Sequence, residues 1–117
     1  IETKLLLKQE NLPTALFAVS NLISLGAIRA ISEEGLKIPE DISMVSFDDQ
    51  PYSRFLSTPM TTVSQQNAQI GQIAIKLLID QIESNRQLEP KGIFLPTKLI
   101  SRDSVKRNIN IGIKAIG

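Results

Sequence analysis

Two adjacent carboxylates, Asp48 and Asp49, directly follow the apolar, β-prone run Ile42–Phe47. In open α/β sheets, ligands bind beyond the carboxyl ends of the strands. A carboxylate placed there can accept hydrogen bonds from vicinal ligand hydroxyls, and each charge-assisted bond contributes about 1.5–3 kcal/mol. The two residues therefore predict a site for a polyhydroxylated small molecule. The alternative is that they only form a turn, which the local pattern by itself favours because Asp is common in turns.

A second polar step, Ser20–Asn21, follows the apolar run Ala15–Val19 and meets the same description of a strand end. Ser and Asn are both strong helix N-cap types. Capping of the following helix therefore explains both residues without a ligand.

This chain lacks the residue types on which most enzymatic chemistry depends. There is no cysteine and no histidine, which excludes thiolate nucleophiles, histidine bases, Ser-His-Asp triads, and cysteine- or histidine-ligated metal sites. The sequence contains no GxGxxG, GxxxxGK[ST] or EF-hand motif. Paired carboxylates at Glu33–Glu34 or Asp48–Asp49 support glycoside hydrolysis only weakly, because adjacent acidic residues on a helix point in different directions. We expect no enzymatic activity, no catalytic residue, no cofactor and no metal.

The composition fits one modest domain with a packed core. The chain has 117 residues, is 42% hydrophobic, and carries a formal net charge of +1. This charge balance argues against a basic nucleic-acid module or a polybasic membrane anchor. No apolar stretch approaches the roughly 20 residues that span a bilayer, and we expect no membrane partner. The first residue is Ile1, which suggests a piece of a longer protein. Arg102, Lys106 and Arg107 are expected to lie on a solvated chain end.

The hydrophobic pattern alternates between strand and helix signals. The run Ala15–Val19 lacks alternation and is expected to be buried on both faces, as in a parallel sheet. Gly35 is expected to end a helix in the left-handed conformation. The isoleucines at 109, 111 and 113 could form an edge strand or a frayed end. We expect helices over Glu2–Gln9, Leu22–Glu34 and Asn67–Glu83, and strands over Ala15–Val19, Ile42–Phe47, Thr61–Ser64, Gly92–Leu95 and Lys98–Ser101. The fold class is α/β, a parallel sheet flanked by helices.

A series of short motifs occurs in one order along residues 13–104: PTALFA (13–18), SN (20–21), SLGA (24–27), EGLKIPEDIS (34–43), FDD (47–49), PMTTV (59–63), Gln65, IG (70–71) and LISRDS (99–104). This series resembles the last third of the effector-binding domain of the lactose/galactose repressor (LacI/GalR) family of bacterial transcription regulators. The resemblance implies the C-terminal portion of a two-lobed, periplasmic-binding-protein-like fold. Residues 1–64 would belong to the C-terminal lobe, 65–95 to a hinge crossing with a helix and a strand of the N-terminal lobe, 96–104 to the return strand, and 105–117 to a tail.

The resemblance also implies a function. Such regulators sense a small effector, usually a sugar, as dimers in the cytoplasm, and they bind operator DNA through an N-terminal helix-turn-helix that is missing from this chain. The partners implied are a second copy of the chain, a sugar or sugar phosphate, and operator DNA only through that missing domain. The alternative is a fragment of a periplasmic sugar-binding protein for uptake. We expect the isolated chain to bind effector weakly or not at all, and to self-associate.

Carried over by position, the effector contacts would be Ser20, Asp48 and Gln65. The common Asn-Asp pair of the family appears here as Ser20–Asn21, which leaves the identity of the effector open. The resemblance places the dimer interface at Leu25, Arg29, Phe55 and Leu56. The alternative for Leu25 and Phe55 is that they are ordinary core residues.

Overall fold

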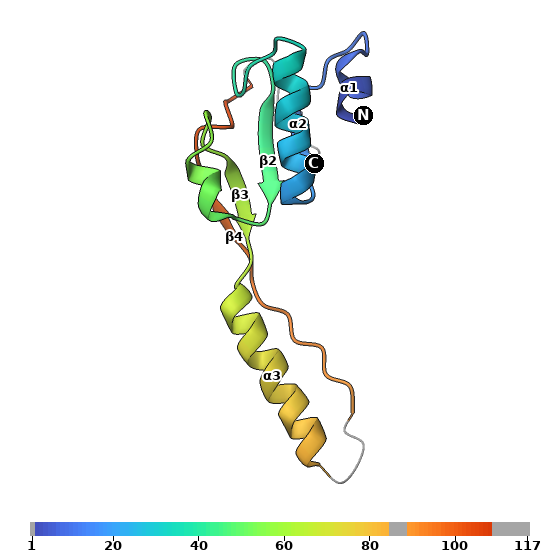
Figure 1. Ribbon diagram of the computed structural model, residues 1–117, viewed down its shortest axis with the longest axis vertical. Coiled ribbons are helices and arrows are strands. Elements are labelled where there is room, and N and C mark those ends of the chain that lie inside the picture. Colours follow the sequence, from blue (N-terminus) through green and yellow to red (C-terminus); the bar gives the residue numbers. More distant parts are fainter. Residues whose placement is uncertain (1, 85–88, 109–117) are drawn as a thin grey trace, which may run out of the picture.

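The computed structural model describes residues 2–84 and 89–108 (Figure 1). In chain order the elements are α1 (Glu2–Leu7), β1 (Ala15–Ala18), α2 (Asn21–Glu33), β2 (Ser43–Phe47), the 3-10 helix η1 (Pro51–Arg54), β3 (Thr61–Ser64), α3 (Asn67–Glu83) and β4 (Lys98–Ile100). None of the helices in these described ranges is long and apolar enough to cross a membrane.

The four strands form one sheet in the order β1-β2-β3-β4. β1 pairs with β2 and β2 with β3 in parallel, whereas β3 and β4 are antiparallel. The predicted α/β class with a parallel sheet is confirmed, and the fourth strand makes the sheet mixed. The parallel strands bring the carboxyl ends of β1, β2 and β3 to the same edge.

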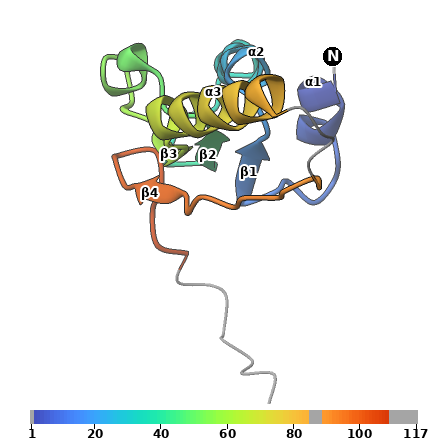
Figure 2. The same cartoon turned by 90° about the horizontal axis from the view of Figure 1, so that it is seen from below.

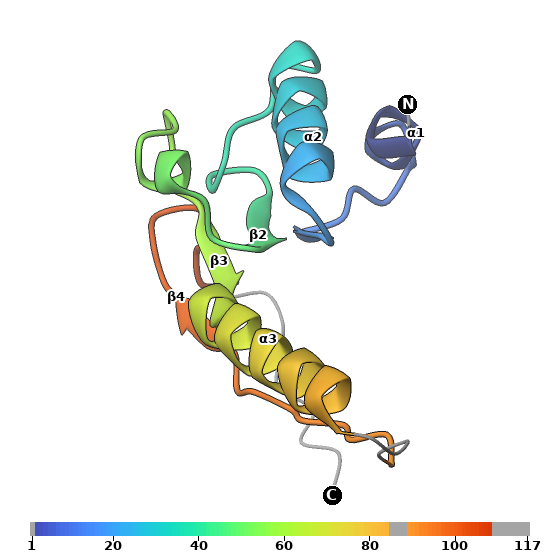
Figure 3. The same cartoon turned by 60° about the horizontal axis from the view of Figure 1, so that its bottom comes forward.

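One predicted strand, Gly92–Leu95, is wrong. Residues 89–97 pair with no described strand and instead run beside α3, away from the sheet (Figures 1 and 3). A strand needs a neighbouring edge for its backbone hydrogen bonds, and the described residues near this segment offer only a helix. The segment and the apolar stripe of α3 line a hollow of about 410 Å³ that includes Ile70, Ile73 and Leu77.

Helix α2 covers one face of the sheet, above the strands in Figure 2. Its buried residues are Ser24, Ala27, Ala30 and Ile31. The core formed between this helix and the sheet comprises Ala18, Ala27, Ile31, Ile42, Met44 and Met60.

The prediction that the run Ala15–Val19 is buried on both faces is wrong. Ala18 is buried, but Phe17 is 57% exposed and Val19 is exposed as well. β1 is an edge strand of the sheet, and α2 packs on only one of its faces. Successive side chains of a strand point to opposite faces, so Phe17 lies on the face that α2 leaves open.

Both ends of α2 follow the local rules of helix capping. The Ser20 hydroxyl accepts a hydrogen bond from the backbone N–H of Ile23 at 3.4 Å. At the other end Gly35 has φ +72°, and the N–H groups of Gly35 and Leu36 donate to the carbonyls of Ser32 and Ile31. This pair of bonds is the Schellman motif, which needs a left-handed residue at its centre. The predicted role of Gly35 is confirmed.

Candidate functional site

Asp48 lies immediately beyond the end of β2, in an unusual backbone conformation. Its φ is +70°, in the left-handed region that Asp tolerates better than most residues with a side chain. The N–H of Asp48 donates to the carbonyl of Val63 in β3 at 2.9 Å. A non-glycine residue in this region costs roughly 1–2 kcal/mol, and such conformations cluster at ligand sites. The neighbouring strand therefore stabilises a turn that aims the Asp48 carboxylate at the edge of the sheet.

Gln65 meets Asp48 at this edge. The Gln65 side-chain amide donates from Nε2 to Oδ1 of Asp48 at 2.6 Å, and both side chains are half-buried. Two of the three predicted effector residues, 17 positions apart in the sequence, are thus in direct contact. An ionised carboxylate has about four acceptor positions, and the amide retains a carbonyl oxygen and a second N–H. Together they can accept hydrogen bonds from adjacent hydroxyls and donate one in return.

Ser20, the third predicted contact, lies at the same edge by strand register. Ala18 of β1 is paired with Ser46 of β2, so Ser20 and Asp48 each follow this pair by two residues. The Ser20 hydroxyl caps α2 through Ile23. The structure therefore shows the capping function of Ser20 directly and leaves a ligand contact as a prediction.

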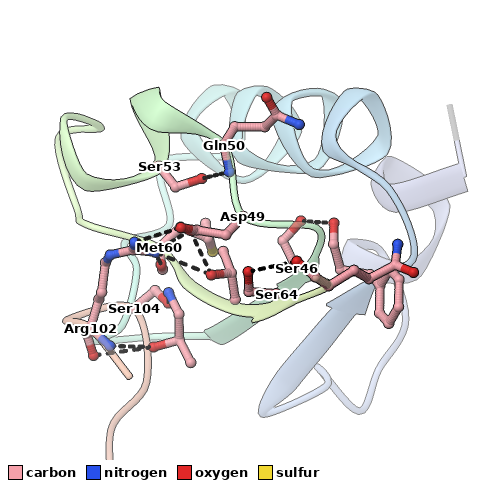
Figure 4. Close-up of polar contacts among 12 residues, drawn as sticks. Ser46, Asp49, Gln50, Ser53, Met60, Ser64, Arg102 and Ser104 are labelled. Carbon is pink, nitrogen blue, oxygen red and sulfur yellow. Dashed lines mark hydrogen bonds and ion pairs between the residues drawn. The ribbon is translucent and has the colours of Figure 1, made fainter. Parts of the chain in front are cut away.

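Asp49 points elsewhere and forms an ion pair that the sequence did not reveal. Arg102 donates from Nη1 to Oδ1 of Asp49 at 2.7 Å and from Nη2 to Oδ2 at 3.2 Å (Figure 4). The Arg102 hydrogen bond is the main cause that lowers the pKa of the Asp49 carboxyl; the Thr62 hydroxyl, which donates to it at 2.8 Å, adds to this, and partial burial opposes it. The Arg102 side chain is only 15% exposed. Its expected place on a solvated chain end is wrong, because the residue folds back onto the end of β2.

The sequence offers only an indirect signal for this pair, the position of Arg102. Arg102 directly follows the β-prone run Lys98–Ser101, and a residue at the end of a strand lies close to the sheet. The sequence alone gives Asp49 no role separate from that of Asp48. Asp48 turns the chain with its left-handed φ just beyond β2, and the two adjacent carboxylates reach different partners, Gln65 and Arg102.

The four predicted interface residues lie on or near the surface. Leu25 is 37% exposed and Phe55 is 77% exposed. Arg29 lies one turn after Leu25 on α2 and donates to Glu33 at 2.7 Å. Leu56 is half-buried and packs against the core. Leu25 and Phe55 are thus not enclosed core residues in this structure.

In residues 2–84 and 89–108, no group of three or more acidic side chains is arranged to hold a metal ion.

Comparison with known proteins supplies the context for this geometry. A model of the periplasmic binding protein-like domain matches residues 2–105. The HTH-type transcriptional repressor PurR of Actinobacillus pleuropneumoniae serotype 3 is 42% identical over 106 residues, which are 90% of this chain and 31% of the repressor. The chain thus spans about a third of the length of the curated relatives it matches.

Two solved structures are similar over most of the chain. A LacI family transcriptional regulator from Enterococcus faecalis V583, with bound ribose, is 36% identical with a TM-score of 0.72, covering 85% of this chain and 36% of the regulator. A dimeric Lac repressor with an 11-residue C-terminal deletion is 32% identical with a TM-score of 0.75, covering 89% of this chain and 38% of the repressor.

Proposed function

Because the chain belongs to the periplasmic binding protein-like domain family, in the form found in LacI/GalR regulators, we propose that it is the effector-sensing and dimerisation part of a bacterial transcriptional repressor. The observation that carries this proposal is the 2.6 Å hydrogen bond between Gln65 and Asp48 at the carboxyl edge of the sheet. It joins two chain segments that a ligand at this edge would contact together.

The effector we propose is a sugar or a sugar phosphate. Asp48 accepts hydrogen bonds from two vicinal hydroxyls, and the Gln65 amide both donates and accepts. The similar regulator from Enterococcus faecalis V583 holds ribose, which supports this ligand class. Ser20 completes the site with one hydroxyl.

Gln65 also lies where the chain leaves the sheet. β3 ends at Ser64 and α3 begins at Asn67, while the returning chain re-enters the sheet at Lys98. The two crossings are joined by a hydrogen bond from Gln66 Nε2 to the Pro96 carbonyl at 3.0 Å. We assign residues 1–64 and 96–104 to one lobe, residues 65–95 to the hinge crossing and the second lobe, and residues 105–117 to a tail. A ligand held by Asp48 and Gln65 then biases the angle between the lobes.

The partners proposed are a second copy of the chain and operator DNA. We place the dimer interface at Leu25, Arg29, Phe55 and Leu56; the similar Lac repressor is dimeric, which supports a dimer. DNA is bound through a helix-turn-helix that lies outside these 117 residues, in the cytoplasm. The gene sequence upstream of Ile1 distinguishes this proposal from a sugar-uptake protein, because a regulator has a helix-turn-helix there and an uptake protein a secretory signal.

The function is tested by a thermal-shift screen of sugars, ribose first, on the full-length gene product. We expect a sugar to raise the melting temperature of the wild type and of Asp103→Asn, an exposed carboxylate outside the site. We expect no rise in Asp48→Asn, because the amide loses the negative charge and one acceptor. The proposal fails if no sugar or sugar phosphate shifts the wild type, or if Asp48→Asn responds as the wild type does.

A further inference from the structure

The ion pair between Asp49 and Arg102 is a half-buried group of charges next to the proposed site, and it is not among the proposed effector contacts. Besides the two bonds to Asp49, Nη1 of Arg102 lies 2.7 Å from the Met60 carbonyl and 3.2 Å from the Thr62 hydroxyl. The Asp49 side chain is 21% exposed. Removing one partner of such a pair leaves the other charge poorly solvated. This network therefore holds its members in one arrangement (Figure 4).

The network fixes the backbone on which Asp48 depends. Asp49 is bonded covalently to Asp48, and its carboxylate is held by a fork-shaped guanidinium at both oxygens. Bidentate pairing restrains direction as well as distance. Asp48 itself adopts a left-handed conformation that its own type only tolerates. Restraint of Asp49 therefore opposes relaxation of Asp48 to an ordinary backbone conformation, which would turn its carboxylate from Gln65.

The same network reaches both strands that cross to α3. The Arg102 N–H donates to the Thr61 hydroxyl at 2.9 Å, and that hydroxyl donates to the Arg102 carbonyl at 3.2 Å. Thr61 begins β3, which leads to Gln65, and Arg102 follows the end of β4, the returning strand. Hydrogen bonds thus connect both crossing strands to Asp49 through Arg102.

We propose that Asp49 and Arg102 are positioning residues of the effector site, which hold Asp48 toward Gln65 and link this alignment to the two crossing strands. This inference rests on the proposed function for the identity of the site. Asp49 and Arg102 do not touch the effector. They set the fraction of molecules in which the Asp48–Gln65 contact is already formed.

The consequence for affinity follows from population arithmetic. The apparent dissociation constant equals the intrinsic constant divided by the fraction of binding-competent molecules. If loss of the ion pair leaves about one molecule in ten competent, the apparent dissociation constant rises about tenfold. A purely structural contribution would lower the melting temperature without this change in affinity measured well below it.

The test uses the full-length gene product labelled with ¹⁵N-glutamine, and variants Asp49→Asn and Arg102→Gln. The matched control is Ile31→Val, which weakens the core beneath α2 and changes no side chain of the ion-pair network. The side-chain amide signal of Gln65 is identified by its absence from the spectrum of Gln65→Ala. Arg102→Lys, which keeps the charge but loses the fork, replaces Arg102→Gln if the latter does not fold.

We expect the Gln65 amide signal to move in the variants of Asp49 and Arg102 and to stay in place in Ile31→Val. We also expect titration with ribose to give an apparent dissociation constant about tenfold higher in these variants, and unchanged in the control. An unmoved Gln65 signal in the folded variants overturns the inference, whatever ribose does. If the wild type does not bind ribose, it is the proposal of ribose as effector that fails, and the Gln65 signal alone decides the positioning role.

Discussion

The loss in free energy of unfolding when the Ser104 hydroxyl is removed tests how the returning chain is attached to the sheet. Its side chain is fully buried, and its hydroxyl donates to the Met44 carbonyl at 2.6 Å while accepting from the Thr61 N–H at 2.8 Å. The Ser104 carbonyl accepts from the Met44 N–H at 2.8 Å. Ser104 thus bonds to β2 as a residue of a neighbouring strand would, next to Thr61, the first residue of β3.

Substitution Ser104→Ala keeps the backbone bond and removes both hydroxyl bonds. The Thr61 N–H then loses its acceptor in a buried position, which costs about 1–3 kcal/mol. The Met44 carbonyl loses a donor as well, and an under-satisfied carbonyl is the less costly of the two. The expected total is about 2–4 kcal/mol of the free energy of unfolding.

The assay is urea unfolding of the full-length gene product, followed by circular dichroism at one protein concentration, because association changes apparent stability. Ser101→Ala is the matched control, since Ser101 is exposed on the same returning segment. We expect the control to stay within about 0.5 kcal/mol of the wild type. A Ser104→Ala variant as stable as the control would refute the assignment of Ser104 as a buried anchor.

Three further predictions concern the helix cap, the interface and the ion pair. Gly35→Ala should lower stability by about 1–2 kcal/mol because of its left-handed φ, whereas Gly26→Ala, inside α2 with open space around it, should raise stability by about 0.5–1 kcal/mol; equal effects in chemical denaturation would contradict this. Leu25→Lys and Phe55→Glu should convert a dimer to a monomer in sedimentation velocity, and an unchanged dimer would remove this face from the interface. The pKa of Asp49 is lowered in the folded protein, so its ion pair stabilises the fold fully only above the unfolded pKa of about 3.9. This stabilisation is lost progressively as the pH falls from there through the folded pKa. The melting temperature of Asp49→Asn should thus fall less between pH 5 and pH 3 than that of the wild type, and parallel curves would contradict the ion pair.

Local signals in the sequence were sufficient for most helices and strands. The α2 boundaries follow from a capping serine and a terminating glycine, both of which act within a few residues. Asn67–Glu83 was predicted at its observed bounds because its apolar stripe is long and regular. Such features depend on the segment alone.

The wrong predictions concern contacts between segments that are far apart in the sequence. Phe17 sits in an unbroken apolar run, but its exposure depends on how many faces of β1 are covered. Gly92–Leu95 has strand-like residues, yet no described strand lies beside it. Arg102 reads as a solvated cation until the partner 53 positions earlier is known. These outcomes depend on contacts between distant residues, which composition and periodicity do not encode.

The resemblance names Asp48 and Gln65 as effector contacts, and the structure places these two side chains in contact with each other. The pattern around Asp48 favoured a simple turn, and nothing local singled out Gln65. The structure contains both a turn and a contact, since the left-handed Asp48 forms the turn and also meets Gln65.

The most direct measurement is a crystal structure of the full-length protein bound to the sugar that raises its melting temperature. The account predicts that two ligand hydroxyls lie at hydrogen-bonding distance, about 2.5–3.0 Å, from the Asp48 carboxylate oxygens, with Gln65 contacting the same ligand. An Asp48 side chain turned away from the bound sugar would contradict it.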